Sequence, residues 1–150
     1  MKVHPETIPV QMGHEPVAAD ALVDTAAWCD LKDAAGVLIT VSHFRGGDTS
    51  LTVDVHEGDT AAGTTQIANN AKIWAATDAL NDPTMVRQTD AKQFVLDQAT
   101  MTGSQIVQFY LDASACKRYV QLGSSGGHGS SIVSVTYQKC GARYKGNEAY

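Results

Sequence analysis

The chain has 150 residues, of which 43% are hydrophobic and 18% are charged, and its formal net charge is -5. This length suits one domain with one core, and the composition excludes a chain that is disordered throughout. The Lys and Arg residues form no run, and no stretch approaches the roughly 20 apolar residues of a membrane span. We therefore expect no membrane partner and no nucleic-acid partner, because nucleic-acid binding needs clustered positive charge.

The first 20 residues differ from the rest of the chain. They contain Pro5, Pro9 and Pro16, with Gly13 between the last two, and no helical or strand period persists. Proline fixes its backbone angle and lacks an amide donor. We therefore predict an extended N-terminal arm over residues 1–20, which is loose in a monomer or ordered against a neighbour in an assembly.

The cysteines and the N-terminal residues indicate a reducing compartment. Cys29, Cys116 and Cys140 are odd in number and widely spaced, which fits buried thiols better than a disulfide framework. Residues 1–6 lack the apolar core of a signal peptide. We expect the protein to be made and kept where thiols stay reduced.

Alternating apolar and polar residues indicate strands from residue 20 onward. Residues 51–56 are the clearest example, and residues 37–44 are rich in β-branched side chains, which favours a central strand. The middle, residues 61–79, is ambiguous: a helix over residues 65–80 and a loop with a short strand near Trp74 are both compatible with it. The predicted strands cover residues 23–31, 37–44, 51–56, 93–98, 105–113, 116–122 and 131–140.

Seven or eight strands in one chain predict an all-β fold. We expect a single-domain antiparallel β-sandwich formed by residues 21–140, with the N-terminal arm before it and a C-terminal tail at residues 141–150.

Asp54 and His56 lie two positions apart on one predicted strand, so their side chains point to the same outward face. Glu57 and Asp59 follow directly. Such a pair is able to hold a metal ion, but a complete site needs further ligands. A solvated strand face that ends in an acidic turn is the favoured interpretation, and we predict no metal site.

The glycine-rich loop at residues 123–130 contains His128. Its backbone amides are able to cradle an anion, yet it has neither the P-loop pattern nor a nucleophile elbow. A hairpin tip is the favoured interpretation, with a small hydrolase that uses His128 as the least favoured alternative. We predict no catalytic residue and no cofactor, and hence no enzyme.

The order of these segments resembles the small capsid cement, or decoration, proteins of tailed bacteriophages, including the family named after a Bordetella phage cement protein. The segment Lys117-Arg118-Tyr119-Val120-Gln121-Leu122, followed by a loop and a last strand, is similar to the strand that those proteins carry before their last hairpin. The resemblance covers about residues 20–140. It implies a jelly-roll-like sandwich that forms a homotrimer on the outside of an icosahedral shell.

The resemblance therefore implies a structural virion protein, synthesised in the host cytoplasm, that stabilises the capsid by bridging major capsid protein subunits. We expect the bridging segments to be the two ends, where binding several subunits at once adds avidity. Trp28 and Trp74 support a carbohydrate-binding sandwich as the alternative function. The candidate contact residues for capsid or subunit are Val3, Ile8, Val10, Tyr144 and Tyr150.

Overall fold

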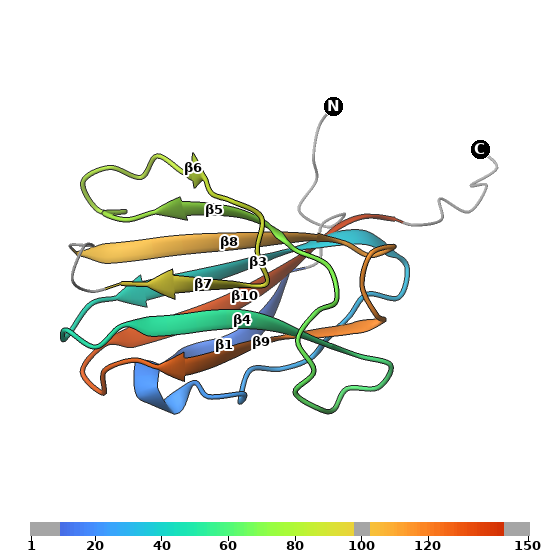
Figure 1. Cartoon of the computed structure of the whole chain (residues 1–150), viewed down its shortest axis with the longest axis horizontal. Coiled ribbons are helices and arrows are strands. Elements are labelled where there is room, and N and C mark those ends of the chain that lie inside the picture. Colours follow the sequence, from blue (N-terminus) through green and yellow to red (C-terminus); the bar gives the residue numbers. More distant parts are fainter. Residues whose placement is uncertain (1–9, 98–102, 143–150) are drawn as a thin grey trace.

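Two antiparallel sheets pack face to face in the computed structural model, which describes residues 10–97 and 103–142 (Figure 1). The strand order is β1-β10-β3-β8-β5-β6 in the six-stranded sheet and β2-β9-β4-β7 in the four-stranded sheet. The predicted all-β antiparallel sandwich is therefore confirmed. The elements are β1 (Val10–Ala18), the 3-10 turn η2 (Ala19–Ala21), β2 (Cys29–Asp30), β3 (Ala34–Phe44), β4 (Leu51–Gly58), β5 (Lys72–Ala76), β6 (Val86–Arg87), β7 (Gln93–Leu96), β8 (Ser104–Asp112), β9 (Tyr119–Gly126) and β10 (Ile132–Ala142).

Alternate residues of each long strand fill the space between the sheets. On β3, the side chains of Val37, Ile39 and Val41 are fully buried, and their neighbours in sequence lie on the outer face. The facing sheet contributes Val53 and Val55 from β4. The strands predicted over residues 37–44, 51–56, 93–98, 105–113 and 131–140 are thus confirmed by β3, β4, β7, β8 and β10.

One hydrogen bond crosses the core from sheet to sheet. The fully buried Tyr137 on β10 accepts a hydrogen bond at its hydroxyl oxygen from the backbone amide of Leu122 on β9, at 3.0 Å. Strand β2 pairs only with Tyr119 and Val120, so this amide lies beyond the short β2–β9 pairing. Burial raises the pKa of the Tyr137 phenol, which keeps it neutral and available as a partner.

The predicted N-terminal arm is wrong for residues 10–18, because these residues form β1 and pair with β10 in the six-stranded sheet. The register shifts between Met12 and His14 and again between His14 and Val17. Bulges and Pro16 are compatible with an edge strand, which needs ladder hydrogen bonds on one side only. Prolines in this segment therefore indicate a sheet edge. Residues 1–9 lie outside the described part.

The predicted strand over residues 23–31 is wrong except for β2. The segment instead begins with η2 and a turn in which Asp24 adopts a left-handed φ of 46°. Leu22, Ala26 and Cys29 are buried, so apolar side chains anchor this segment without a regular strand period. Burial also raises the pKa of the Cys29 thiol. Cys116 and Cys140 are half-buried, and no disulfide joins the three.

The middle of the chain contains a strand, and the helix alternative over residues 65–80 is wrong. Ile73 and Ala75 of β5 face the core while Trp74 points outward, which is the period of a strand. Strand β9 also continues to Gly126, because Gly123 pairs with Asp54 and extends the ladder into the predicted loop. None of the helices in the described residues is long and apolar enough to cross a membrane.

Removing the Tyr137 hydroxyl tests the contact between the sheets. Tyr137→Phe leaves the buried Leu122 amide without its partner, so we expect the free energy of unfolding to fall by about 1–3 kcal/mol. Urea denaturation followed by circular dichroism measures this change. Tyr110→Phe, on the outer face of β8, is the matched control and is expected to change stability by less than about 0.5 kcal/mol. Equal effects of the two substitutions would contradict the proposed role of the bond.

Candidate functional site

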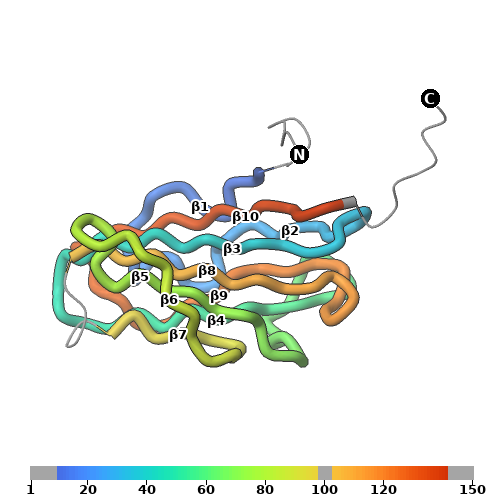
Figure 2. The backbone as a smooth tube through the Cα atoms, turned by 90° about the horizontal axis from the view of Figure 1, so that it is seen from above, coloured from blue at the N-terminus to red at the C-terminus, as the bar shows by residue number. Residues whose placement is uncertain are grey.

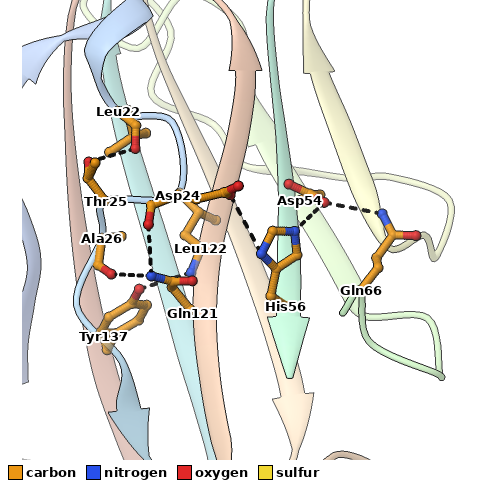
Figure 3. Close-up of polar contacts among 10 residues, drawn as sticks. All are labelled: Leu22, Asp24, Thr25, Ala26, Asp54, His56, Gln66, Gln121, Leu122 and Tyr137. Carbon is orange, nitrogen blue, oxygen red and sulfur yellow. Dashed lines mark hydrogen bonds and ion pairs between the residues drawn. The ribbon is translucent and has the colours of Figure 1, made fainter. Parts of the chain in front are cut away.

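A cluster of polar side chains lies on the outer face of the four-stranded sheet, around His56 (Figure 3). Asp54 and His56 project from β4, as their spacing predicts. Gly123 of β9 lies opposite Asp54 in the ladder, and Gln121 lies opposite His56. Two strands of one sheet therefore supply the floor of the cluster.

A segment that we call the strap, residues 22–28, covers this part of β9 (Figure 3). The Gln121 side-chain amide donates hydrogen bonds to the carbonyl oxygens of Ala26, at 2.5 Å, and Asp24, at 3.2 Å. The Thr25 hydroxyl donates to the Leu22 carbonyl at 2.8 Å and closes the turn. These bonds place the Asp24 carboxylate beside His56.

The imidazole of His56 lies between two carboxylates, and its side chain is only 7% exposed. Its Nε2 is 2.9 Å from Asp54 Oδ2, a hydrogen-bond distance, and its Nδ1 is 3.6 Å from Asp24 Oδ1, an ion-pair distance. Gln66 donates a weaker hydrogen bond to Asp54 at 3.4 Å. The predicted solvated face is therefore wrong for His56, because the strap shields it.

Gly123 provides the room for this arrangement. A Cβ atom at position 123 would lie 2.5 Å from His56 Cε1, 2.7 Å from Asp54 Oδ1 and 2.8 Å from Asp24 Oδ1. Real Cβ atoms do not approach heavy atoms so closely. Only glycine lets the imidazole lie flat over β9 between its two carboxylates.

The imidazole of His56 bridges two carboxylates and acts as a clamp between them. Both ring nitrogens of His56 face carboxylates, so neither is directed at an open position where a substrate would sit. Over the described ranges, residues 10–97 and 103–142, no group of three or more His, Cys, Asp or Glu side chains is placed to hold a metal ion. The clamp joins the strap to β4 across β9.

The predicted acidic group of Asp54, His56, Glu57 and Asp59 divides into separate interactions. Glu57 is buried and accepts hydrogen bonds from the backbone amides of Ala68, at 3.0 Å, and Lys117, at 2.9 Å. Asp59 forms an exposed ion pair with Lys117 Nζ at 2.9 Å, which raises the pKa of that lysine. Glu57 therefore anchors two loops to the end of β4.

His128 in the glycine-rich loop has a local structural role. Its Nδ1 accepts a hydrogen bond from the Ser130 amide at 3.1 Å, and its carbonyl accepts one from the Ser131 amide at 2.9 Å. The ring also lies against Gly47 in the β3–β4 loop, where a Cβ would be 2.3 Å from His128 Cγ. These contacts connect two neighbouring loop tips.

The two tryptophans are both half-buried. The Arg87 guanidinium carbon lies 4.7 Å from the centre of the Trp74 ring, so one face of that ring is occupied by a cation. Trp28 lies near Gly58, where a Cβ would be 3.7 Å from its ring. Neither arrangement adds support for the sugar-stacking platform expected of the alternative function.

Of the five candidate contact residues, only Val10 lies within the residues that the structure describes. Val10 is the first residue of β1, pairs with Gln138 and is 63% exposed. Val3, Ile8, Tyr144 and Tyr150 lie outside the described residues. Asp24 and Gln121, which complete the His56 cluster, were not predicted, because no spacing in the sequence relates them to Asp54 and His56.

A second buried histidine lies inside the sandwich, near one end of the core. His43 and Gln105 are each 1% exposed, and His43 Nδ1 lies 2.8 Å from Gln105 Oε1, an acceptor. This contact places the proton of the neutral ring on Nδ1. Nε2 is buried without a hydrogen-bond partner, so a second proton there would be an unpaired buried charge. Burial accordingly lowers the pKa of His43 from its ordinary value of 6.5.

We expect Gly123→Ala to lower the free energy of unfolding by about 1–3 kcal/mol, because the new methyl group displaces the His56 ring. Ser125→Ala, on the same face of β9, is the control and is expected to change stability by less than about 0.5 kcal/mol. In the double variant Gly123→Ala/His56→Ala the conflict with the imidazole, the closest of the three contacts, is gone, so the cost of the double variant falls below the sum of the single costs. Strictly additive costs in urea denaturation would contradict this account.

The His43 environment predicts a loss of stability in acid. Because the folded-state pKa is below 6.5, the unfolded chain binds the proton more readily. The stability contributed by the neutral ring is fully present at a pH above the pKa of His43 in the unfolded chain. This stability is lost as the pH falls from that pKa toward the lower pKa of His43 in the folded protein. Urea unfolding between pH 7.5 and about pH 5 should therefore be less pH-dependent in His43→Gln than in the wild type.

A variant that lowers stability without removing a titrating group controls for this measurement. Val41→Ala creates a cavity on the same strand, and it should keep the pH dependence of the wild type. Identical pH profiles for His43→Gln and the wild type would refute the assignment.

Comparison with known protein families, with curated proteins and with solved structures finds no match for this chain.

Proposed function

We propose that this chain is a structural protein of a bacteriophage virion that binds the outside of the capsid and bridges major capsid protein subunits, as a homotrimer. The resemblance to cement proteins motivates this proposal, and the positions of the chain ends carry it. Val10 pairs with Gln138 near the end of β10, so β1 begins where β10 ends. The segments with Val3, Ile8, Tyr144 and Tyr150 are thus attached to neighbouring strands at one end of the sandwich.

Attachment at one place favours binding by both segments together. Two weak contacts from one rigid body raise each other's effective concentration, so their combined affinity exceeds either one alone. This is the property that a bridging protein needs on a shell with repeated subunits. The sandwich then acts as the spacer between the bridging segments and the solvent.

The strand order supports the jelly-roll part of the proposal. When the β5–β6 hairpin is set aside, eight strands remain in the chain order β1, β2, β3, β4, β7, β8, β9 and β10. Numbered one to eight in that order, they give the sheet orders 1-8-3-6 and 2-7-4-5. These orders support a double-sheet jelly roll, an architecture of viral proteins and also of lectins. The fold therefore agrees with both functions considered, and the chain ends favour the first.

The position of residues 117–122, the segment that resembles a strand of the cement proteins, agrees with the proposal as well. Residues 119–122 begin β9, the strand before the last strand β10, which lies in the other sheet. Val120 and Leu122 are buried, and Gln121 holds the strap. Arg118 forms two hydrogen bonds with Asp30, at 2.9 and 2.7 Å, and lowers the pKa of that carboxyl group to about 2. The segment thus supports the sandwich.

Co-sedimentation with purified icosahedral phage shells tests the function. The truncation must stop at Pro9, because residues 10–18 belong to the sheet. We expect the full chain to sediment with shells, and deletion of residues 1–9 or of residues 143–150 to weaken binding at least about tenfold through lost avidity. Val95→Ser, exposed on β7, is the control and should bind as the wild type.

Two results would contradict the proposal. Full occupancy of shells by both truncated chains would show that the ends do not bridge. Binding of the full chain to glycans on an array, lost in Trp74→Ala and without any binding to shells, would favour the carbohydrate-binding alternative.

A further inference from the structure

One part of the outer face of the six-stranded sheet carries almost no charge. Strands β1, β10, β3 and β8 run side by side in this sheet (Figure 2). We call the outer surface of these four strands the neutral face: its side chains belong to the even-numbered residues of β3 and β8, to those of β10 from Ile132 to Cys140, and to Val10 and Met12 of β1. Lys72 of β5 and Arg87 of β6 lie beyond it, at the β5–β6 edge of the same sheet. Asp112, at the end of β8, is the only charged residue among these positions.

The rest of the molecule is different. The chain has a net charge of -5, and 18% of its residues are charged. The outer side of the four-stranded sheet carries Asp54 and His56 and the ion pair between Asp30 and Arg118. An antiparallel sheet face that only meets water has no reason to exclude charge, because solvated faces normally carry it. The net charge is therefore concentrated away from the neutral face.

Four exposed large apolar side chains also lie on the neutral face. Val10 is 63% exposed and Met12 51% on β1, while Phe44 is 55% exposed on β3 and Ile132 is 48% exposed on β10. Between them the neighbouring strands present threonines and serines at positions 40, 42, 134 and 136. An apolar rim with short hydroxyl side chains at its centre is flat and lets another sheet approach closely.

The two edges of the sheet do not favour growth by added strands. Strand β1 carries two register shifts and Pro16, and β6 at the other edge has two residues. Bulges, proline and short edge strands are the devices that prevent edge-to-edge pairing. Association of this sheet therefore has to use its face.

We propose that the neutral face is the surface on which copies of this chain associate. A copy is the partner that this face fits best, because it brings an equally uncharged surface and its sheet has the same twist. Twisted sheets of the same hand stack face to face at small angles, as the two layers of a sandwich do. An acidic or basic partner would find only Asp112 among the charged residues of this face.

The neutral face is large enough to form a stable interface between two proteins. Strand β3 has 11 residues, which at about 3.3 Å each gives roughly 36 Å, and four strands about 4.8 Å apart give roughly 19 Å. The flat area is thus about 700 Å², close to the roughly 800 Å² that each partner buries in a stable interface. Two identical faces stacked on each other form a two-fold pair, so this surface joins two copies. The inference therefore goes beyond the homotrimer of the proposed function, and it is testable without a capsid.

Sedimentation velocity of the full chain, over a range of concentrations, tests the proposal. We expect the wild type to sediment as an oligomer of the 15.9 kDa chain. Thr136→Glu places a like charge at the centre of the neutral face in every copy, so it should weaken association at least about tenfold. Thr52→Glu, equally half-buried on the outer face of β4, is the matched control and should keep the mass of the wild type.

Two further measurements keep the test decisive. An equimolar mixture of Thr136→Glu and Thr136→Lys should regain the mass of the oligomer, because the charges now attract. If Thr136→Glu fails to fold, Met12→Glu replaces it, since this exposed edge position tolerates charge. A wild type that is monomeric at every concentration overturns the proposal, and so does an oligomer that Thr52→Glu dissociates while Thr136→Glu does not.

The shell assay separates this inference from the proposed function. An oligomer that dissociates as predicted but binds no shell refutes the capsid role and leaves the neutral face as a self-association surface. A monomer that binds shells refutes the inference and leaves the capsid role in place.

Discussion

The hydrogen bond between the Tyr137 hydroxyl and the Leu122 amide fixes how the two sheets sit on each other. Hydrophobic burial brings the sheets together but does not choose their offset, because it is not directional. A single buried amide with one available partner does choose it, since a shift of either sheet leaves the amide unpaired. The short β2 creates this requirement because it begins only at Cys29 and leaves the part of β9 beyond Val120 without a neighbouring strand on that side.

The strap and the His56 clamp supply polar partners to the same part of β9 on the outside of the sheet. Gln121 satisfies the carbonyls of the strap, and the strap brings Asp24 to the open side of His56. Gly123 makes the arrangement sterically possible. The cluster joins the strap to β4 and β9.

The two outer faces of the sandwich differ in charge, and the proposed self-association follows from that difference. One face is covered by the strap and by ion pairs, and the other is neutral, flat and partly apolar. Copies that associate through the neutral face would present several pairs of chain ends from one assembly. Such multiplicity is what turns weak contacts into firm attachment on a shell of repeated subunits.

Much of the fold was predictable from the sequence, because strands β3, β4, β8 and β10 each bury one face and so alternate with a clear period of two. The site was less predictable. The spacing of Asp54 and His56 gives their common direction, but Asp24 arrives from a distant turn, and only the folded chain shows that the strap covers His56. The prolines of residues 1–20 predict an arm, but Pro16, the one proline within residues 10–18, is compatible with an edge strand that needs hydrogen bonds on one side only.

By itself, then, the sequence determined the all-β class, most of the strands and the side chains that fill the core, since all of these depend on local alternation. Tertiary structure alone decided the pairing of β1 with β10, the bond across the core, the clamp around His56 and the neutral face. Each of these depends on which segments, far apart in the chain, become neighbours, and local alternation carries no information about that choice.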